Sequence, residues 1–270
     1  MATLVARVLP YDAVAGLGGG RGHVLVERSL MVYRRSWLII VSGFFEPLFY
    51  LLSIGIGLGK LVPHVTVAGQ DVRYTAFVAP ALLASSAMNG AIYDSTFNIF
   101  WKMKYAKLYD AMLSTPLGPL DIASGEIAWA LARGVIYSTA FLVVMAAMGL
   151  VHSMWALLAL PFSIFEALAF AACGMAATTF MRSWQDFEWV TLSILPMFLF
   201  SATFYPLSTY PHVLGDIVRW TPLYQAVDMQ RALILGHLHP GLLANLGYLV
   251  GMGLIGVFIA TRRLGLLLLK

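Results

Sequence analysis

The chain has 270 residues, of which 60% are hydrophobic and 11% charged. A soluble domain has about 25% charged residues, so this composition excludes an ordinary soluble protein and indicates an integral membrane protein. The net charge of +4 is clustered rather than spread, which argues against a nucleic-acid partner, and the single cysteine, Cys173, excludes an intrachain disulfide. At about 20 apolar residues per span, about six spans fit the length, so we expect an all-α fold.

Residues 1–23 are expected to be a flexible cytoplasmic N-terminus rather than a signal peptide, because Arg7, Pro10 and Asp12 interrupt any apolar core. An amphipathic helix is predicted over residues 24–36, leading into Trp37. Its apolar face carries Val26, Leu30, Tyr33 and Trp37, and its other faces carry Glu27, Arg28, Arg34 and Arg35. Such a helix is typical of a segment that lies along a membrane surface, and a simple charge anchor is the alternative.

Apolar runs predict the spans, and the interruptions between them predict the loops. The expected spans are residues 37–59, 74–101, 127–150, 154–181, 189–205 and 242–260. Gly55, Gly57 and Gly59 would allow a close helix contact or a helix break. Polar loops are expected at 62–73 and 182–188.

The segment 206–240 is broken by Pro211 and Pro222 yet retains apolar pieces. Irregular backbone at membrane depth is tolerated only where it is buried in protein or lines a cavity. A partly embedded, re-entrant hairpin on the outer side is therefore predicted between the fifth and sixth spans.

The charged loop after the second span has its own helical pattern. Tyr105, Leu108, Tyr109 and Met112 recur at the spacing of one helix face, and Pro116 then Pro119 end the pattern. This predicts a short amphipathic helix. Two interpretations stay open: an ordinary solvated loop, and a helix that docks into a groove of a soluble partner.

Lys and Arg residues set the orientation, since cytoplasmic loops carry an excess of them. With the N-terminus inside, most basic residues fall on the inner side, and the outer side holds Lys60, Arg73, Arg219 and Arg231. We therefore expect a multi-pass protein of the bacterial plasma membrane with both termini cytoplasmic. Most of the histidines fall outside and are scattered, which favours surface polarity over a metal site.

Ionisable groups within spans are functional candidates because their burial in a bilayer is costly. Glu46, Asp94 and Glu166 could contact a substrate, carry protons or pair between helices; Asn98, one turn from Asp94, favours pairing there. Glu126, Arg133 and Glu188 lie nearer the inner surface, where they would be solvated or pair with one another. The candidate substrate pathway adds aromatic side chains of the first and fifth spans: Phe45, Phe49, Tyr50, Phe198 and Phe204.

Catalytic motifs are not found. The sequence GIGLGK has Ile54 where a phosphate-binding loop needs its first glycine and Leu61 where it needs Ser or Thr, so no nucleotide site is expected. A membrane-embedded transferase acting on a lipid-linked substrate, with Glu46 or Asp94 as base, is an alternative function. A passive scaffold or channel is a third.

Five features, in chain order, carry a family resemblance: a surface helix ending in Arg34 and Arg35, EPLFY followed by GIGLG, YDAMLSTPLGPLDIASGE, PMFLFSATFYP and TPLYQAVDMQRALILG. From about residue 24 onward the chain resembles the ABC-2 type transporter permeases, most of all the nodulation-type subgroup and related antibiotic-resistance permeases. The resemblance implies a half-transporter that pairs with a second permease, identical or paralogous, and with two copies of a separate ATPase.

The resemblance also implies roles for segments and residues. Residues 24–36 would be a connecting helix, 102–119 would hold the coupling helix, and 206–240 would be the outer re-entrant hairpin. ATP and magnesium would bind the partner, and this chain would bind no cofactor. The exported substrate would be amphipathic: a drug, a lipid-linked oligosaccharide or a glycolipid. Residues assigned to ATPase coupling are Tyr105, Leu108, Tyr109, Met112, Gly125, Glu126, Arg34 and Arg35.

Overall fold

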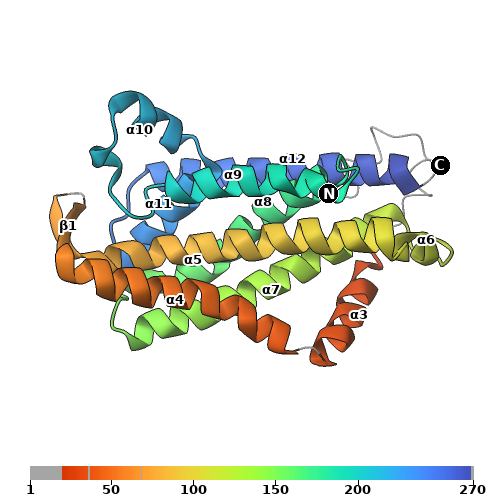
Figure 1. Cartoon of the computed structure of the whole chain (residues 1–270), viewed down its shortest axis with the longest axis horizontal. Coiled ribbons are helices and arrows are strands. Elements are labelled where there is room, and N and C mark those ends of the chain that lie inside the picture. The colour runs from red at the N-terminus through yellow and green to blue at the C-terminus, as the bar shows by residue number, and fades with distance from the viewer. Residues whose placement is uncertain (1–19, 36, 68, 269–270) are drawn as a thin grey trace.

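The computed structural model describes residues 20–35, 37–67 and 69–268; the side chains of residues 35, 37–44, 46, 47, 56 and 268 lie outside the described residues. Long helices run along one axis, with α3 and α6 at one end and β1 and α10 at the other (Figure 1). We call these the α6 end and the α10 end. The elements are α3 (Gly22–Arg35), α4 (Trp37–Leu61), β1 (His64–Val67), β2 (Gln70–Arg73), α5 (Tyr74–Tyr93), η1 (Asp94–Asn98), η2 (Trp101–Tyr105), α6 (Leu108–Leu113), α7 (Pro119–Ala147), η3 (Met154–Leu158), α8 (Ala159–Thr178), η4 (Trp184–Asp186), α9 (Phe187–Leu199), η5 (Leu207–Thr209), α10 (His212–Arg219), α11 (Pro222–Leu235) and α12 (Gly241–Leu268).

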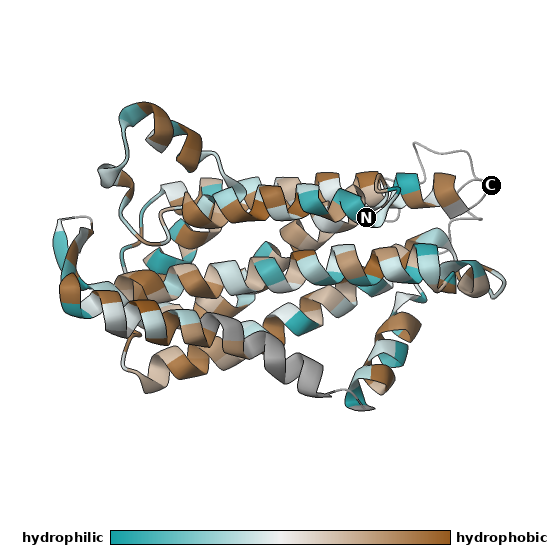
Figure 2. Ribbon diagram, in the orientation of Figure 1, coloured by the Kyte–Doolittle hydropathy of each residue, from teal (hydrophilic) through white to brown (hydrophobic). Residues whose placement is uncertain are grey.

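Among the described residues, four helices are long and apolar enough to cross a membrane: Tyr74–Tyr105, Pro119–Ala147, Met154–Thr178 and Gly241–Leu267. They match the second, third, fourth and sixth predicted spans. The first predicted span is a continuous helix, α4, and its glycines do not break it. Apolar residues predominate along the long helices, whereas the hairpin of β1 and β2 has a larger share of polar residues (Figure 2).

The fifth predicted span, 189–205, is wrong in its length. Helix α9 has 13 residues and ends at Leu199. Residues 201–203 are irregular yet buried, and Ala202 has a left-handed backbone with φ of 54°. The buried guanidinium of Arg231 donates to the carbonyl oxygen of Ala202 at 2.7 Å, so α11 supplies the partner that the broken helix lacks.

The loop predicted at 62–73 is instead an antiparallel hairpin, so the fold is not purely helical. Strand β1 pairs with β2 in a register that sets Val65 opposite Val72. Alternating β-branched residues favour strands, and Gly69, with φ of 80°, suits a tight turn. This short hairpin caps the α10 end of α4 and α5.

Helix α5 forms the centre of the bundle, and small residues let its neighbours approach. A Cβ on Gly256 of α12 would lie 2.8 Å from the backbone of Ala172 in α8. The small residues of α8 therefore let α12 pack closely against it. Gly55 is likewise in close contact, since its Cβ would lie 2.5 Å from Thr75, whereas Gly57 and Gly59 face open space.

The segment 206–240 is two helices rather than an irregular hairpin. Helix α10 is largely exposed, whereas α11 is buried against α5 and α12. Thr221 caps α11 by accepting a hydrogen bond from the backbone N–H of Tyr224, and Pro222 occupies its first turn. The prolines that interrupt the apolar pattern thus mark helix starts.

Candidate functional site

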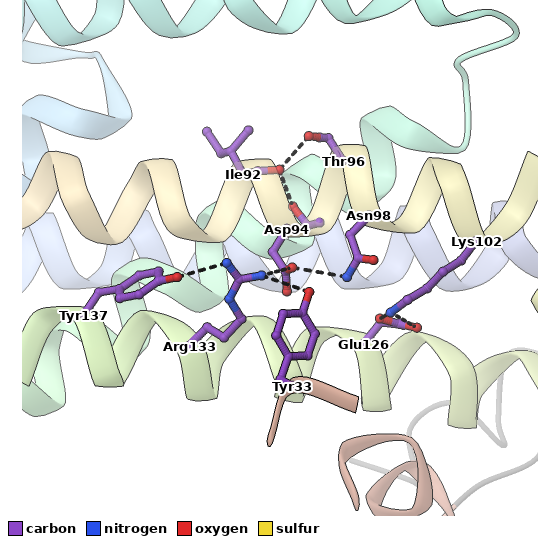
Figure 3. A network of polar contacts seen from close by, with 10 residues as sticks. Tyr33, Ile92, Asp94, Thr96, Asn98, Lys102, Glu126, Arg133 and Tyr137 are labelled. Carbon is purple, nitrogen blue, oxygen red and sulfur yellow. Dashed lines mark hydrogen bonds and ion pairs between the residues drawn. The ribbon is translucent and has the colours of Figure 1, made fainter. Parts of the chain in front are cut away.

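A polar network joins α3, α5 and α7 at the α6 end of the molecule (Figure 3). It begins where α5 passes into two successive π-helical segments, η1 and η2. Single π turns inside helices are frequent at functional sites because they re-aim side chains at the cost of regular hydrogen bonding. Here they present Asp94 and Lys102 toward α7.

Arg133 of α7 is the centre of this network. Its Nη1 donates to Asp94 Oδ1 at 2.5 Å and to the Tyr33 hydroxyl at 3.4 Å, and its Nη2 donates to the Tyr137 hydroxyl at 3.0 Å. The Arg133 and Asp94 side chains are only 13% and 3% exposed. Asn98 donates to the same Asp94 oxygen at 3.2 Å, which confirms the pairing predicted for Asp94.

Tyr33 brings α3 into the network. Its ring lies under the Arg133 guanidinium, 5.3 Å from the ring centroid, and packs on Trp129 at 5.1 Å. Burial, followed by the Asp94 carboxylate, raises the pKa of the Tyr33 phenol above its ordinary value of 10.0. The phenol is therefore neutral at physiological pH and accepts the arginine's hydrogen bond through its oxygen.

A second ion pair lies about two helical turns nearer the α6 end. Lys102 Nζ donates to both oxygens of Glu126, at 2.9 and 2.7 Å. Of the two alternatives predicted for Glu126, Arg133 and Glu188, mutual pairing is wrong for Glu126 and Arg133, because η2 and η1 supply Lys102 and Asp94 as their partners. Glu188 is exposed, as the solvated alternative expects. Tyr109 of α6 is buried beside Glu126, and burial together with that carboxylate raises the pKa of Tyr109 well above 10.0.

Gly125 holds α3 against α7. A Cβ at this position would lie 2.6 Å from the Gly22 carbonyl oxygen and 2.7 Å from Leu25 Cβ. The Gly22 oxygen is a backbone atom, so it could not move aside without shifting α3 itself. The face of α3 that packs on α7 is formed by Leu25 and Ser29, whereas Leu30, on the predicted apolar face, is 62% exposed.

The predicted face of the coupling helix points into the protein. The helix breaks at Lys107, whose φ is 45°, so Tyr105 belongs to the preceding π segment and is exposed. In α6, Tyr109 and Met112 are buried against Ile122 and Leu25, and Leu108 is half-buried. The apolar stripe is thus what fixes α6 to this chain, and the surface open to another protein consists of Lys104, Tyr105, Lys107, Asp110, Ala111 and Ser114.

Some of the aromatic residues predicted to line a substrate pathway contact one another at the α10 end. Tyr50 of α4 meets Phe198 of α9 at 5.9 Å between ring centroids, and Phe198 meets Phe204 at 5.3 Å. Phe45 and Phe49 stack at 5.7 Å on the exposed side of α4. The side chains of Glu46 and Arg35 lie outside the described residues.

A family model described as ABC-2 type transporter matches residues 22–235, a range that contains every residue of this network. The chain belongs to the ABC-2 type transporter family. It is therefore a transporter permease, and the resemblance inferred from its motifs is confirmed.

Relatives match nearly the whole ABC-2 permease. Over 263 residues it is 33% identical to Nodulation protein J of Rhizobium leguminosarum bv. trifolii, covering 96% of this chain and 99% of the relative. Over 255 residues it is 30% identical to Nodulation protein J of Rhizobium meliloti (strain 1021), covering 93% and 95%.

Glu166 lies away from the network and from any open surface. Its carboxyl group is fully buried in α8 and accepts a hydrogen bond from Gln230 Nε2 at 3.4 Å; the same nitrogen reaches the Ser163 hydroxyl at 2.9 Å. In this structure Glu166 tethers α8 to α11. Its proposed contact with substrate would require these helices to separate.

Sequence reasoning missed Arg231 as an interior residue and placed it among exposed outer charges. It is 8% exposed, donates to the carbonyl oxygens of Phe77 and Ala202 at 3.3 and 2.7 Å, and lies 3.9 Å from the Phe77 ring centroid. Its partners are carbonyl oxygens and a ring, which no charge pattern reveals. The apolar residues around it in α11 were the available signal.

Proposed function

We propose that this permease is the membrane subunit of an exporter that moves an amphipathic substrate and is driven by a separate ATPase. The α6 end is cytoplasmic in this proposal, as are both termini. ATP and magnesium bind to the partner, and this chain binds neither. The observation that carries the proposal is the buried network that ties α3, at the cytoplasmic surface, to η1, η2 and α7 inside the bundle.

The network could transmit a displacement of α6 to the membrane-spanning helices. A partner that pushes on α6 moves Tyr109 and Met112, which are packed against α7 and α3. Lys102 and Glu126 then join η2 to α7, and Arg133 joins α7 to both Asp94 and Tyr33. Because these contacts are ion pairs and hydrogen bonds with discrete geometries, they suit a switch between two arrangements of the spans, each with its own affinity for substrate.

Exposed apolar surface on α4 and α9 supports the proposed substrate class. Phe49 is 62% exposed, and on α9 Trp189 and Leu192 are 70% and 62% exposed. In a pair of permeases, identical or paralogous, these two helices would supply apolar walls to a route at the interface. Such walls suit a molecule with an apolar part, including a lipid-linked oligosaccharide or glycolipid.

The transferase alternative has less support. Asp94 would have to act as a free base, but its carboxylate is held by Arg133 and Asn98. Glu46, the other candidate base, lies outside the described side chains. No observation on the described residues favours a passive channel.

The exposed face of α6 provides the test. We expect Ala111→Arg to weaken retention of a co-purifying ATPase about tenfold, because a central interface position is worth about 1–2 kcal/mol or more. The protein should still fold, since Ala111 is exposed and the buried Tyr109 is untouched. The measurement is a mild-detergent pull-down of the tagged chain from its native membrane, with ATP hydrolysis assayed in the eluate.

Gln70→Arg is the matched control, because it adds the same side chain to an exposed position of β2 at the α10 end. It should leave ATPase retention unchanged. If no ATPase accompanies the wild-type chain, or if Ala111→Arg retains it fully, the coupling assignment of α6 is wrong.

A further inference from the structure

A largely apolar groove runs along α9, on the side that faces α5, α8 and α12. Its volume is about 670 Å³. Apart from Thr96, Ser193, Arg182 and Asp186, its lining is apolar or weakly polar. Its walls include Ile92, Phe170, Cys173, Ala177, Trp189, Ile194, Met197 and Met252.

The groove has the length of one membrane leaflet. It runs from Asp186, at the end of η4, along α9 to Met197, which is roughly 16 Å at 1.5 Å per residue. The hydrocarbon core of a bilayer is about 30 Å thick, so half of it is about 15 Å. The groove therefore begins at the α6 end and reaches about the midplane.

Its mouth at the α6 end is cationic. Arg182 lines the mouth, and the guanidinium of Arg263 lies 4.0 Å from the ring centroid of Phe180, another lining residue. Asp186 is also there, but its carboxylate accepts backbone N–H bonds from Arg182 and Ser183 at 2.6 and 3.0 Å. These bonds, and to a lesser extent the Arg182 charge, lower the pKa of Asp186, so its carboxylate stays ionised. With Arg182 and Arg263 each at +1 and Asp186 at −1, the mouth keeps a net charge of +1, and no described carboxylate lies within salt-bridge distance of the Arg182 guanidinium.

We propose that this groove binds a phospholipid with an anionic headgroup, taken from the leaflet at the α6 end. One acyl chain lies along α9 against Ala177 and Ile194, and the headgroup phosphate meets Arg182 and Arg263. Water is disfavoured along apolar walls at this depth, and arginine is suited to phosphate oxygens. The inference rests on the membrane setting of the proposed function but not on its ATPase.

The test is native mass spectrometry of the detergent-purified chain titrated with phosphatidylglycerol or with phosphatidylcholine of the same acyl chains. Wild type should bind phosphatidylglycerol about fivefold more tightly, since one arginine near anionic lipid contributes about 1 kcal/mol. Arg182→Gln should remove most of that preference. Ala177→Phe, which fills the groove, should reduce binding of both lipids.

Arg219→Gln is the matched control, because Arg219 is exposed on α10, far from the groove mouth along the chain's axis. It should leave the preference unchanged. If Ala177→Phe fails to fold, alkylation of Cys173, the single cysteine, reports on the groove in the wild-type chain. Added phosphatidylglycerol should slow that alkylation at least fivefold more than phosphatidylcholine does.

Either of two results would overturn the proposal. One is lipid binding that neither Arg182→Gln nor Ala177→Phe changes. The other is a lipid-free dimer in which Cys173 is already protected, which would mean that a second copy of the chain fills the groove. Loss of ATPase co-purification would leave both readouts unaffected, so failure of the proposed function is distinguishable.

Discussion

Replacing Arg133 with methionine is expected to destabilise the permease by about 3–5 kcal/mol, because the Asp94 carboxylate would remain buried without its cation. Transport should be lost as well, since Arg133 joins α7 both to η1 and, through Tyr33, to α3. Thermal unfolding in detergent measures the first effect. Substrate-stimulated ATP hydrolysis by the reconstituted complex measures the second.

The double variant Arg133→Met with Asp94→Leu separates the two effects. Removing both charges leaves no unpaired ion, so much of the stability should return. Transport should not return, because the discrete contact between α7 and η1 is still missing. A double variant that is stable and fully active would show that the ion pair is only a packing element.

Arg219→Gln is the control for ion pairs in general. Arg219 and Asp216 are 4.0 Å apart, and their side chains are 63% and 76% exposed. Exposed pairs contribute about 0–1 kcal/mol, so this variant should unfold close to wild type and transport normally. The contrast with Arg133→Met isolates the effect of burial.

The helices whose residues recur with a clear period or form long apolar runs were predicted from the sequence. The amphipathic period before Trp37 predicted α3, the period around Tyr109 predicted α6, and long apolar runs predicted α5, α7, α8 and α12. These features depend on which residues recur on one face, and the sequence displays that directly. The ordered motifs also identified the family, because a family is defined by such patterns.

Partners across the fold could not be predicted in the same way. Periodicity showed that Tyr109 and Met112 share a face, but it could not show whether that face packs on this chain or on another protein. Arg133 lies 39 residues from Asp94, and the π turns that aim Asp94 at α7 have no recognisable sequence signal. The hairpin of β1 and β2 was missed because four-residue strands resemble a polar loop.

The end of α9 was missed for a related reason. The apolar sequence continues past Leu199, and hydropathy alone cannot distinguish a buried helix from buried irregular backbone. Irregular backbone can be buried here because Arg231, on α11, donates a hydrogen bond to the Ala202 carbonyl oxygen. A buried carbonyl needs a partner, and that partner is a property of the tertiary fold.

Gly125→Ala is expected to detach α3 from α7. The added Cβ would overlap the Gly22 carbonyl oxygen at 2.6 Å and Leu25 Cβ at 2.7 Å, and such overpacking costs about 1–3 kcal/mol. Without that contact Tyr33 loses its position beside Arg133, so under the proposed function ATP hydrolysis by the partner should no longer drive transport. The Lys102–Glu126 pair should persist, which keeps the change local to α3.

Labelling of a cysteine on α3 reports the detachment. Ser29 is 5% exposed on the face toward α7, so Ser29→Cys in a Cys173→Ala background should react slowly with a soluble maleimide, and much faster once Gly125→Ala is added. Gly57→Ala is the control, since nothing lies within 4 Å of its added Cβ. Each Gly→Ala change stabilises its helix by about 1 kcal/mol through helix propensity. A difference in labelling rate between the two variants therefore reports the contact between Gly125 and α3. Unchanged labelling with full transport in Gly125→Ala would show that α3 tolerates the displacement and that Gly125 does not set its position.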